Sequence, residues 1–178
     1  LLDVMLESGE CLMQSHEDVQ FFLPRAHTID RSELEAFIKE RKVPVTITEN
    51  HTYDLMQICD VCLAASGTAT LETAMMELPT VLLYKVSPIT YGIGKMVVNL
   101  THVGLPNIVA GKEVIPELLQ GDVSVDAIVN TVLPLLDDLH INQSMRTELR
   151  GVKEKLGESG AVNRVAQLIY DLGKERIN

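Results

Sequence analysis

The sequence has few aromatic residues, no tryptophan and no apolar run long enough to cross a bilayer. Aromatics make up 4% of its 178 residues and hydrophobic residues 46%, so the core must be aliphatic. A membrane-spanning helix needs roughly 18–20 consecutive apolar residues, and neither such a run nor a secretory signal is present. Glycine and proline are too infrequent to indicate disorder. The length suits roughly one globular domain with a sizeable core.

Cysteine is scarce, and its spacing does not indicate a disulfide framework. The three cysteines are Cys11, Cys59 and Cys62, a pattern unlike that of small disulfide-rich secreted domains. Cys59 and Cys62 form a C-x-x-C motif, but they end a predicted helix and enter a predicted strand, whereas a thioredoxin-type pair opens a helix. A zinc site would need a second ligand pair, and the sequence shows none. We therefore predict buried, reduced thiols, no metal site and a cytosolic compartment.

Basic residues are outnumbered, which argues against nucleic-acid binding. The chain carries 15 Lys and Arg against 25 Asp and Glu, for a net charge of −10, whereas nucleic-acid-binding domains are typically basic. Residues 78–112 differ, because they contain Lys85, Lys95 and Lys112 and no acid. Such a window indicates local attraction to phosphates or anionic lipid headgroups. The alternative is a largely buried segment, where acidic side chains would be costly.

The central pattern is an apolar strand at residues 61–65, a tight turn at Ser66, Gly67 and Thr68, a helix over 69–78 and a second apolar strand. Two apolar runs around one helix predict a βαβ unit. The turn then lies at the carboxyl end of a parallel strand and the amino end of a helix, which favours an anion. Gly67 allows close approach of the backbone to a ligand, and Ser66 and Thr68 can cap the helix or bind phosphate. An ordinary capped turn is the alternative.

Glu72 follows Thr68 by one helical turn and shares its face. Its carboxylate is predicted to lie within reach of the hydroxyl groups of a bound sugar. The alternative is that its negative charge only complements the helix dipole.

Elsewhere the amino-terminal part alternates between strand and helix patterns. Asp30 with Glu33 forms a capping box, and the helices and strands are predicted at residues 1–15, 19–23, 30–38, 43–48 and 53–58. Four strands alternating with helices predict an α/β fold: a Rossmann-like parallel sheet with helices on both faces. Carboxyl-terminal helices follow, one kinked at Pro134, one capped by Asn142 and a last amphipathic helix ending near Leu172.

Two segments after Tyr84 are interpreted individually. Residues 88–100 predict a helix whose apolar side chains either join the core or meet lipid or a partner domain. Residues 103–110 predict a tight loop leading into a short edge strand. Asn107 then lies at a strand start, where its amide is presented to a ligand or forms an Asx-turn.

Several segments resemble the carboxyl-terminal half of the lipid-A-disaccharide synthase family. They read ASGTATLE at residues 65–72, PTV at 79–81, YKVSP at 84–88 and LPNIVAGKE at 105–113. The S-G-T-x-x-x-E pattern is also similar to nucleotide-binding segments of other two-domain (GT-B) glycosyltransferases, whereas the L-P-N segment is more specific. The resemblance implies a GT-B carboxyl-terminal domain lacking its first strand. Residues 1–122 would form the truncated UDP-sugar-binding domain, and the helices of 123–178 would pack on it or on a partner domain.

The resemblance also implies an activity. The family transfers 2,3-diacylglucosamine with inversion from its UDP donor to 2,3-diacylglucosamine 1-phosphate, without a cofactor, giving the lipid A disaccharide. It implies a cytoplasmic enzyme, peripheral at the inner-membrane surface of a bacterium. A homodimer formed through the carboxyl-terminal helices is a further expectation. Ser66, Gly67 and Thr68 would cradle the pyrophosphate, and Glu72 would bind the ribose. Asn107 would lie near the donor, and the loop from Asn50 to Tyr53 near the uracil, in the crevice where open α/β sheets bind nucleotides.

The resemblance also marks what is missing. The sequence opens at Leu1 without an initiating methionine, so we expect a longer protein whose preceding part holds the first strand, its L-P-G-S-R-type loop and the general base. His51 and Asp54 lie where donor binding is expected, so neither is assigned as the base. His102 has no identifiable carboxylate partner in the sequence, which favours a surface or structural role. Alone, the chain is predicted to be inactive and to bind UDP weakly at best.

Two other functions stay open. One is another UDP-sugar enzyme of GT-B type, such as a peptidoglycan N-acetylglucosaminyl transferase or a UDP-N-acetylglucosamine epimerase. The other is a non-catalytic nucleotide-binding module. Acceptor specificity would separate the enzymes, and the lysines of residues 78–112 argue against the module.

Overall fold

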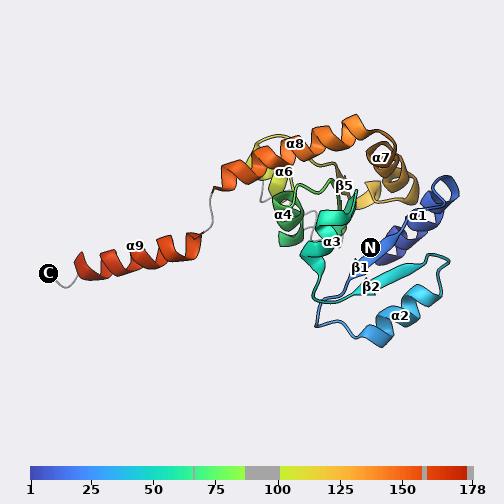
Figure 1. The fold of residues 1–178 in the computed structure, drawn as a ribbon, viewed down its shortest axis with the longest axis horizontal. Helices are drawn as coiled ribbons and strands as arrows, with labels where there is room; N and C mark the ends of the chain where they lie inside the picture. Colours follow the sequence, from blue (N-terminus) through green and yellow to red (C-terminus); the bar gives the residue numbers. More distant parts are fainter. Residues whose placement is uncertain (66, 87–100, 158–159, 176–178) are drawn as a thin grey trace.

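The strands of the computed structural model, which describes residues 1–65, 67–86, 101–157 and 160–175, are all paired in parallel. β1 (Phe21–Pro24) pairs with β2 (Val45–Thr48), and β4 (Thr80–Tyr84) lies between β3 (Cys62–Ala65) and β5 (Glu117–Leu119). Within the described residues, the β1–β2 pair and the β3–β4–β5 sheet are not hydrogen-bonded to each other. The predicted parallel α/β architecture is confirmed (Figure 1).

Helices cover both faces of the three-stranded sheet. The described helices are α1 (Leu2–Ser15), α2 (Arg31–Lys39), α3 (Thr52–Ile58), α4 (Thr68–Met75), α6 (Leu105–Ala110), α7 (Val125–Asp137), α8 (Leu139–Leu156), α9 (Ala161–Glu175) and the short 3-10 helix η1 (Gln120–Asp122). Val81 and Leu83 of β4 pack with residues of α1 and α7, whereas Leu82 between them packs with residues of α4 and α8. Successive side chains of a strand point to opposite faces, so one strand contributes to both cores.

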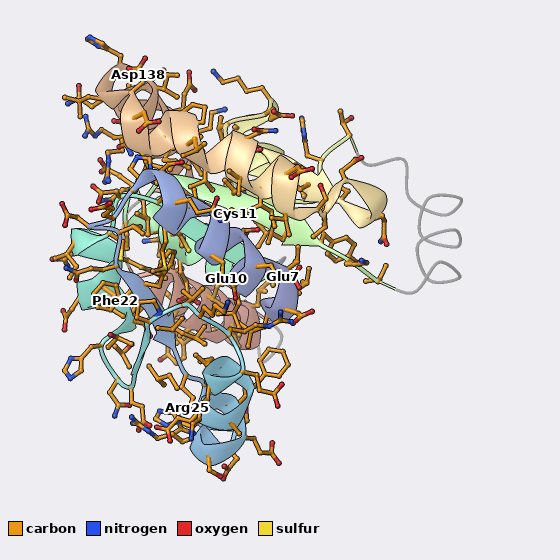
Figure 2. All side chains as sticks on the ribbon, turned by 90° about the vertical axis from the view of Figure 1, so that its right-hand side faces the viewer. Glu7, Glu10, Cys11, Phe22, Arg25 and Asp138 are labelled. Carbon is orange, nitrogen blue, oxygen red and sulfur yellow. The ribbon has the colours of Figure 1, made fainter. Side chains whose placement is uncertain are left out.

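α1 lies between α7 and α2 (Figure 2). Its Leu12 joins the core cluster of α7, and its Leu6 joins Leu34 and Ile38 of α2. Gly9 permits this close packing, because a Cβ there would lie 3.3 Å from side-chain atoms of Phe21 and Val43. α1 therefore connects the β1–β2 pair to the three-stranded sheet.

The helix boundaries test the predicted caps. Asp30 caps α2 as predicted, accepting hydrogen bonds from the backbone N–H groups of Ser32 and Glu33. The cap predicted at Asn142 is wrong, because Asp138, four residues earlier, caps α8 by accepting from His140 N and Ile141 N. Asn142 lies inside α8, where its buried Nδ2 donates to the carbonyl oxygens of Asp60 and Leu135.

The strand predicted within residues 103–110 is also wrong, because Leu105–Ala110 form helix α6. Pro106 lies in its first turn and Gly111 ends it with φ 75°, and these two residue types favour the start and end of a helix. The edge strand comes later, as β5.

Two further expectations concern the membrane. The predicted helix over 88–100, with its proposed lipid-facing side, lies outside the described residues. Among the helices that are described, none is both long and apolar enough to span a bilayer.

The predicted last amphipathic helix is present as α9, which extends away from the rest of the described chain (Figure 1). Its apolar side chains are largely exposed, with Val162 at 81% and Ile169 at 65%. α7 and α8, by contrast, contribute buried residues to the two core clusters.

The turn that follows α4 contains a glutamate in the left-handed region. Glu77 has φ 56°, its N–H donates to Ala74 O, and Leu78 N donates to Thr73 O, which together form a Schellman motif. The Glu77 carboxylate accepts hydrogen bonds from Arg150 at 2.8 Å and Lys153 at 3.4 Å, both on α8. The bond from Arg150 is the main cause that lowers the pKa of Glu77.

Replacing Glu77 with glutamine is expected to lower stability at neutral pH and to change its pH dependence. A carboxyl group whose pKa is lowered on folding stabilises the protein above its unfolded pKa, near 4.5 here, and this contribution is lost as pH falls through the folded pKa. Urea unfolding should therefore show a stability difference between wild type and Glu77→Gln at pH 7 that shrinks in acid. Glu148→Gln, which breaks an exposed ion pair to Lys112, is the matched control and should change little. An undiminished difference in acid would contradict the assignment.

Candidate functional site

Loops at the carboxyl ends of the parallel strands carry the candidate site. Arg25 follows β1 and Glu49 follows β2, and Arg25 Nε donates to Glu49 Oε1 at 2.9 Å. Arg31 also contacts Glu49, at 3.2 Å, and the hydrogen bond from Arg25 is the main cause that lowers the pKa of Glu49. Sequence reasoning missed this network, although a charged residue directly after each of two neighbouring strands was the available signal.

The turn after β3 has a backbone that only glycine adopts easily. Gly67 has φ 131° and ψ −163°, a region essentially restricted to glycine. No atom lies within 4 Å of the position a Cβ would take, so the backbone faces open space. Ser66 lies outside the described residues.

Among the described residues, no side chain caps the start of α4. Thr68, its first residue, is exposed. The hydroxyl of Thr70 donates to Gly67 O at 2.8 Å instead. Uncapped N–H groups at a helix start favour an anion.

The structure brings together Glu72 of α4 and Tyr53 of α3, two residues predicted from the sequence. The Tyr53 hydroxyl donates to Glu72 Oε2 at 3.2 Å. Tyr53 is 56% exposed and Glu72 is half-buried. The negative charge of Glu72, followed by this hydrogen bond, raises the pKa of Tyr53, which keeps the phenol protonated as a donor.

The loop between β2 and α3 is exposed and adjoins this pair. Asn50 has φ 65°, a left-handed conformation that asparagine tolerates. His51 Nδ1 lies 3.1 Å from Asp54 Oδ2, with both side chains more than 70% exposed (71% and 76%). Asn50 and Tyr53 therefore flank a solvent-facing surface at the rim.

Asn107 does not point its amide outward as the sequence predicts, while its position near the donor stays a prediction. Its side chain is fully buried (0% exposed). Nδ2 donates to Ile115 O and to Glu117 Oε1, and Oδ1 accepts from Val114 N and Ile115 N. The physical reason is that Asn107 lies on α6 with its side chain directed at the segment before β5. Its hydrogen bonds hold that segment against α6.

Glu117 accepts several hydrogen bonds around this asparagine. Its carboxylate binds the N–H groups of Val103 and Gly104, both at 2.9 Å. His102 Nδ1 lies 4.0 Å from Glu117 Oε1. The sequence alone identifies no carboxylate partner for His102, whereas the fold brings Glu117 near it; its surface or structural role stays a prediction.

The described residues offer no cluster of three or more His, Cys, Asp or Glu side chains that could hold a metal ion. All three cysteines are free. Cys59 follows α3 and Cys62 begins β3, as the C-x-x-C analysis predicts. Burial raises the pKa of both thiols, that of Cys62 to about 12, so neither is an activated nucleophile.

One hollow among the described residues lies away from the rim. It has a volume of about 330 Å³ and lies between α2 and β2, lined by residues such as Ile38 and Val45. Gly67, Tyr53 and Glu72 are not among its lining residues. Because Thr68 and Tyr53 are exposed, the candidate site faces solvent.

Comparison with known proteins identifies close relatives. A family model described as lipid-A-disaccharide synthetase matches residues 1–169. A lipid-A-disaccharide synthase of Geobacter sulfurreducens is 42% identical over 176 residues, which is 98% of this chain and 46% of the relative. Those of Geobacter metallireducens and Syntrophotalea carbinolica are 38% and 35% identical, each over 99% of this chain and 46% of the relative. The chain spans about half the length of the curated relatives it matches.

Proposed function

The chain belongs to the lipid-A-disaccharide synthetase family, and on that premise we propose that it forms the donor-binding half of a glycosyltransferase. The whole protein would transfer 2,3-diacylglucosamine from its UDP donor to 2,3-diacylglucosamine 1-phosphate. The observation that carries this proposal is the arrangement of the Gly67 turn, the uncapped start of α4 and Glu72 one turn further along.

Three parts of the donor, namely the pyrophosphate, the ribose and the uracil, are each assigned to a feature of the chain. Backbone N–H groups at Gly67 and Thr68, with the Ser66 hydroxyl, would bind the pyrophosphate, since the uncapped helix start favours negative charge. The Glu72 carboxylate would accept hydrogen bonds from the ribose. The exposed loop carrying Asn50 and Tyr53 would contact the uracil.

The strand arrangement supports a nucleotide crevice at this place. Phe21 of β1 and Leu63 of β3 pack against the same core cluster, yet the two strands do not pair within the described residues. One further strand between them would give the order β2-β1-x-β3-β4-β5, which is the strand order of a Rossmann fold. In such folds ligands bind where the strand order reverses, beside the Gly67 turn.

The acyl chains of the proposed substrates indicate where the whole protein would work. Both proposed substrates carry acyl chains, so we place the whole protein on the cytoplasmic surface of a bacterial inner membrane. The exposed apolar side of α9 would pack on another part of the longer protein or on a second copy. We assign no general base within these residues.

A direct assay tests the proposal. A protein of the relatives' full length, given UDP-2,3-diacylglucosamine and 2,3-diacylglucosamine 1-phosphate, is expected to form the tetraacyl disaccharide phosphate. The 178-residue chain alone is expected to form none. Transfer of N-acetylglucosamine to a lipid-linked peptidoglycan precursor, or epimerisation of UDP-N-acetylglucosamine, would replace the proposal.

A further inference from the structure

The hydrogen bond between Tyr53 and Glu72 connects two helices that begin at the same rim of the fold. We propose that Tyr53 is a positioning residue, which holds the Glu72 carboxylate in the orientation that accepts hydrogen bonds from the ribose of a nucleoside diphosphate. This inference rests on the proposed function, because it assigns Glu72 to the ribose.

Buried side chains hold both α3 and α4 in the fold. Ordering the contact between them therefore requires only the torsions of the Tyr53 and Glu72 side chains to be restrained. Buried Leu55 and Met56 anchor α3, and buried Thr73 and Ala74 anchor α4. Glu72 itself is half-buried and extends from this anchored helix. A free glutamate side chain loses rotamer entropy when it binds a ligand, and a partner that orders it beforehand removes part of this cost.

The hydrogen bond also leaves room for the ligand. A carboxylate offers about four acceptor positions, and Tyr53 occupies one of them, on Oε2. Oε1 has no hydrogen-bond partner among the side chains that the structure describes. Because a protonated phenol can only donate to a carboxylate, Tyr53 orients Glu72 without neutralising it.

The test compares affinities for UDP and for 2′-deoxy-UDP, measured by titration calorimetry with the full-length protein. Tyr53→Phe removes only the phenol oxygen and is expected to weaken UDP binding about three- to tenfold, the range for one hydrogen bond. The preference for UDP over 2′-deoxy-UDP should shrink in Tyr53→Phe and disappear in Glu72→Ala. The double variant should bind UDP no more weakly than Glu72→Ala alone, since Tyr53 acts through Glu72.

Tyr170→Phe is the matched control, because Tyr170 on α9 is 58% exposed and lies outside the rim. It should bind both nucleotides as the wild type does. If Glu72→Ala keeps wild-type affinity and preference, the proposed ribose contact fails. If Glu72→Ala is weakened but Tyr53→Phe is not, the positioning role alone is overturned. An effect of Tyr53→Leu without one of Tyr53→Phe would assign Tyr53 to stacking on the base instead.

Discussion

Replacing Asn107 with alanine is expected to lower the free energy of unfolding by about 3–5 kcal/mol. The change removes every hydrogen bond of a fully buried amide. It leaves the N–H groups of Val114 and Ile115, the carbonyl of Ile115 and part of the Glu117 carboxylate without partners. Each buried polar group left unsatisfied costs about 1–3 kcal/mol, partly relieved by relaxation. Urea unfolding of the full-length protein would measure the loss.

Asn107→Asp sharpens this experiment because it keeps the shape. One carboxylate oxygen can still accept from Val114 N and Ile115 N, but the other replaces a donor that lies 2.7 Å from Glu117 Oε1. Two adjacent carboxylates repel, so we expect a loss comparable to that of alanine at neutral pH and a partial recovery in acid. Asn130→Ala, at an exposed position of α7, is the control and should be neutral. If Asn107→Ala is as stable as the wild type but binds UDP more weakly, Asn107 belongs to the donor site instead.

Replacing Glu72 with alanine is expected to raise the dissociation constant for UDP about tenfold or more. Hydrogen bonds to a charged group contribute roughly 1.5–3 kcal/mol, which corresponds to that factor. Glu72→Gln keeps one acceptor and should lose less. Stability should change little in either variant, because the one described polar contact of Glu72 is with exposed Tyr53.

Calorimetric titration with UDP separates the two interpretations of Glu72. Loss of affinity without a shift in melting temperature supports the ribose contact. Unchanged affinity in both variants would mean that the glutamate only complements the dipole of α4.

Features that depend on neighbouring residues were predictable from the sequence. The Asp30 cap, the apolar strands around α4 and the glycine of the Gly67 turn all follow from local chemistry. The family resemblance predicts Tyr53 and Glu72 as parts of one site, although it does not predict their direct contact.

Features that depend on distant partners were missed. A left-handed backbone after a helix is most often adopted by glycine, yet Glu77 adopts it after α4. The partners of its carboxylate, Arg150 and Lys153, lie far along the chain on α8. The local pattern of residues 103–110 predicts a strand start at Asn107, but its hydrogen-bond partners belong to the distant segment before β5. No pattern within a short window contains either set of partners.

The thiol of Cys62 gives the sheet an internal reporter of its own opening. With a pKa of about 12, roughly one in 10⁵ of these thiols is ionised at pH 7, and thiolate is the form that reacts with alkylating reagents. Alkylation of Cys62 in the folded protein is therefore expected to be slow. Opening of β3, the strand that leads into the Gly67 turn, would return the thiol to water and speed the reaction.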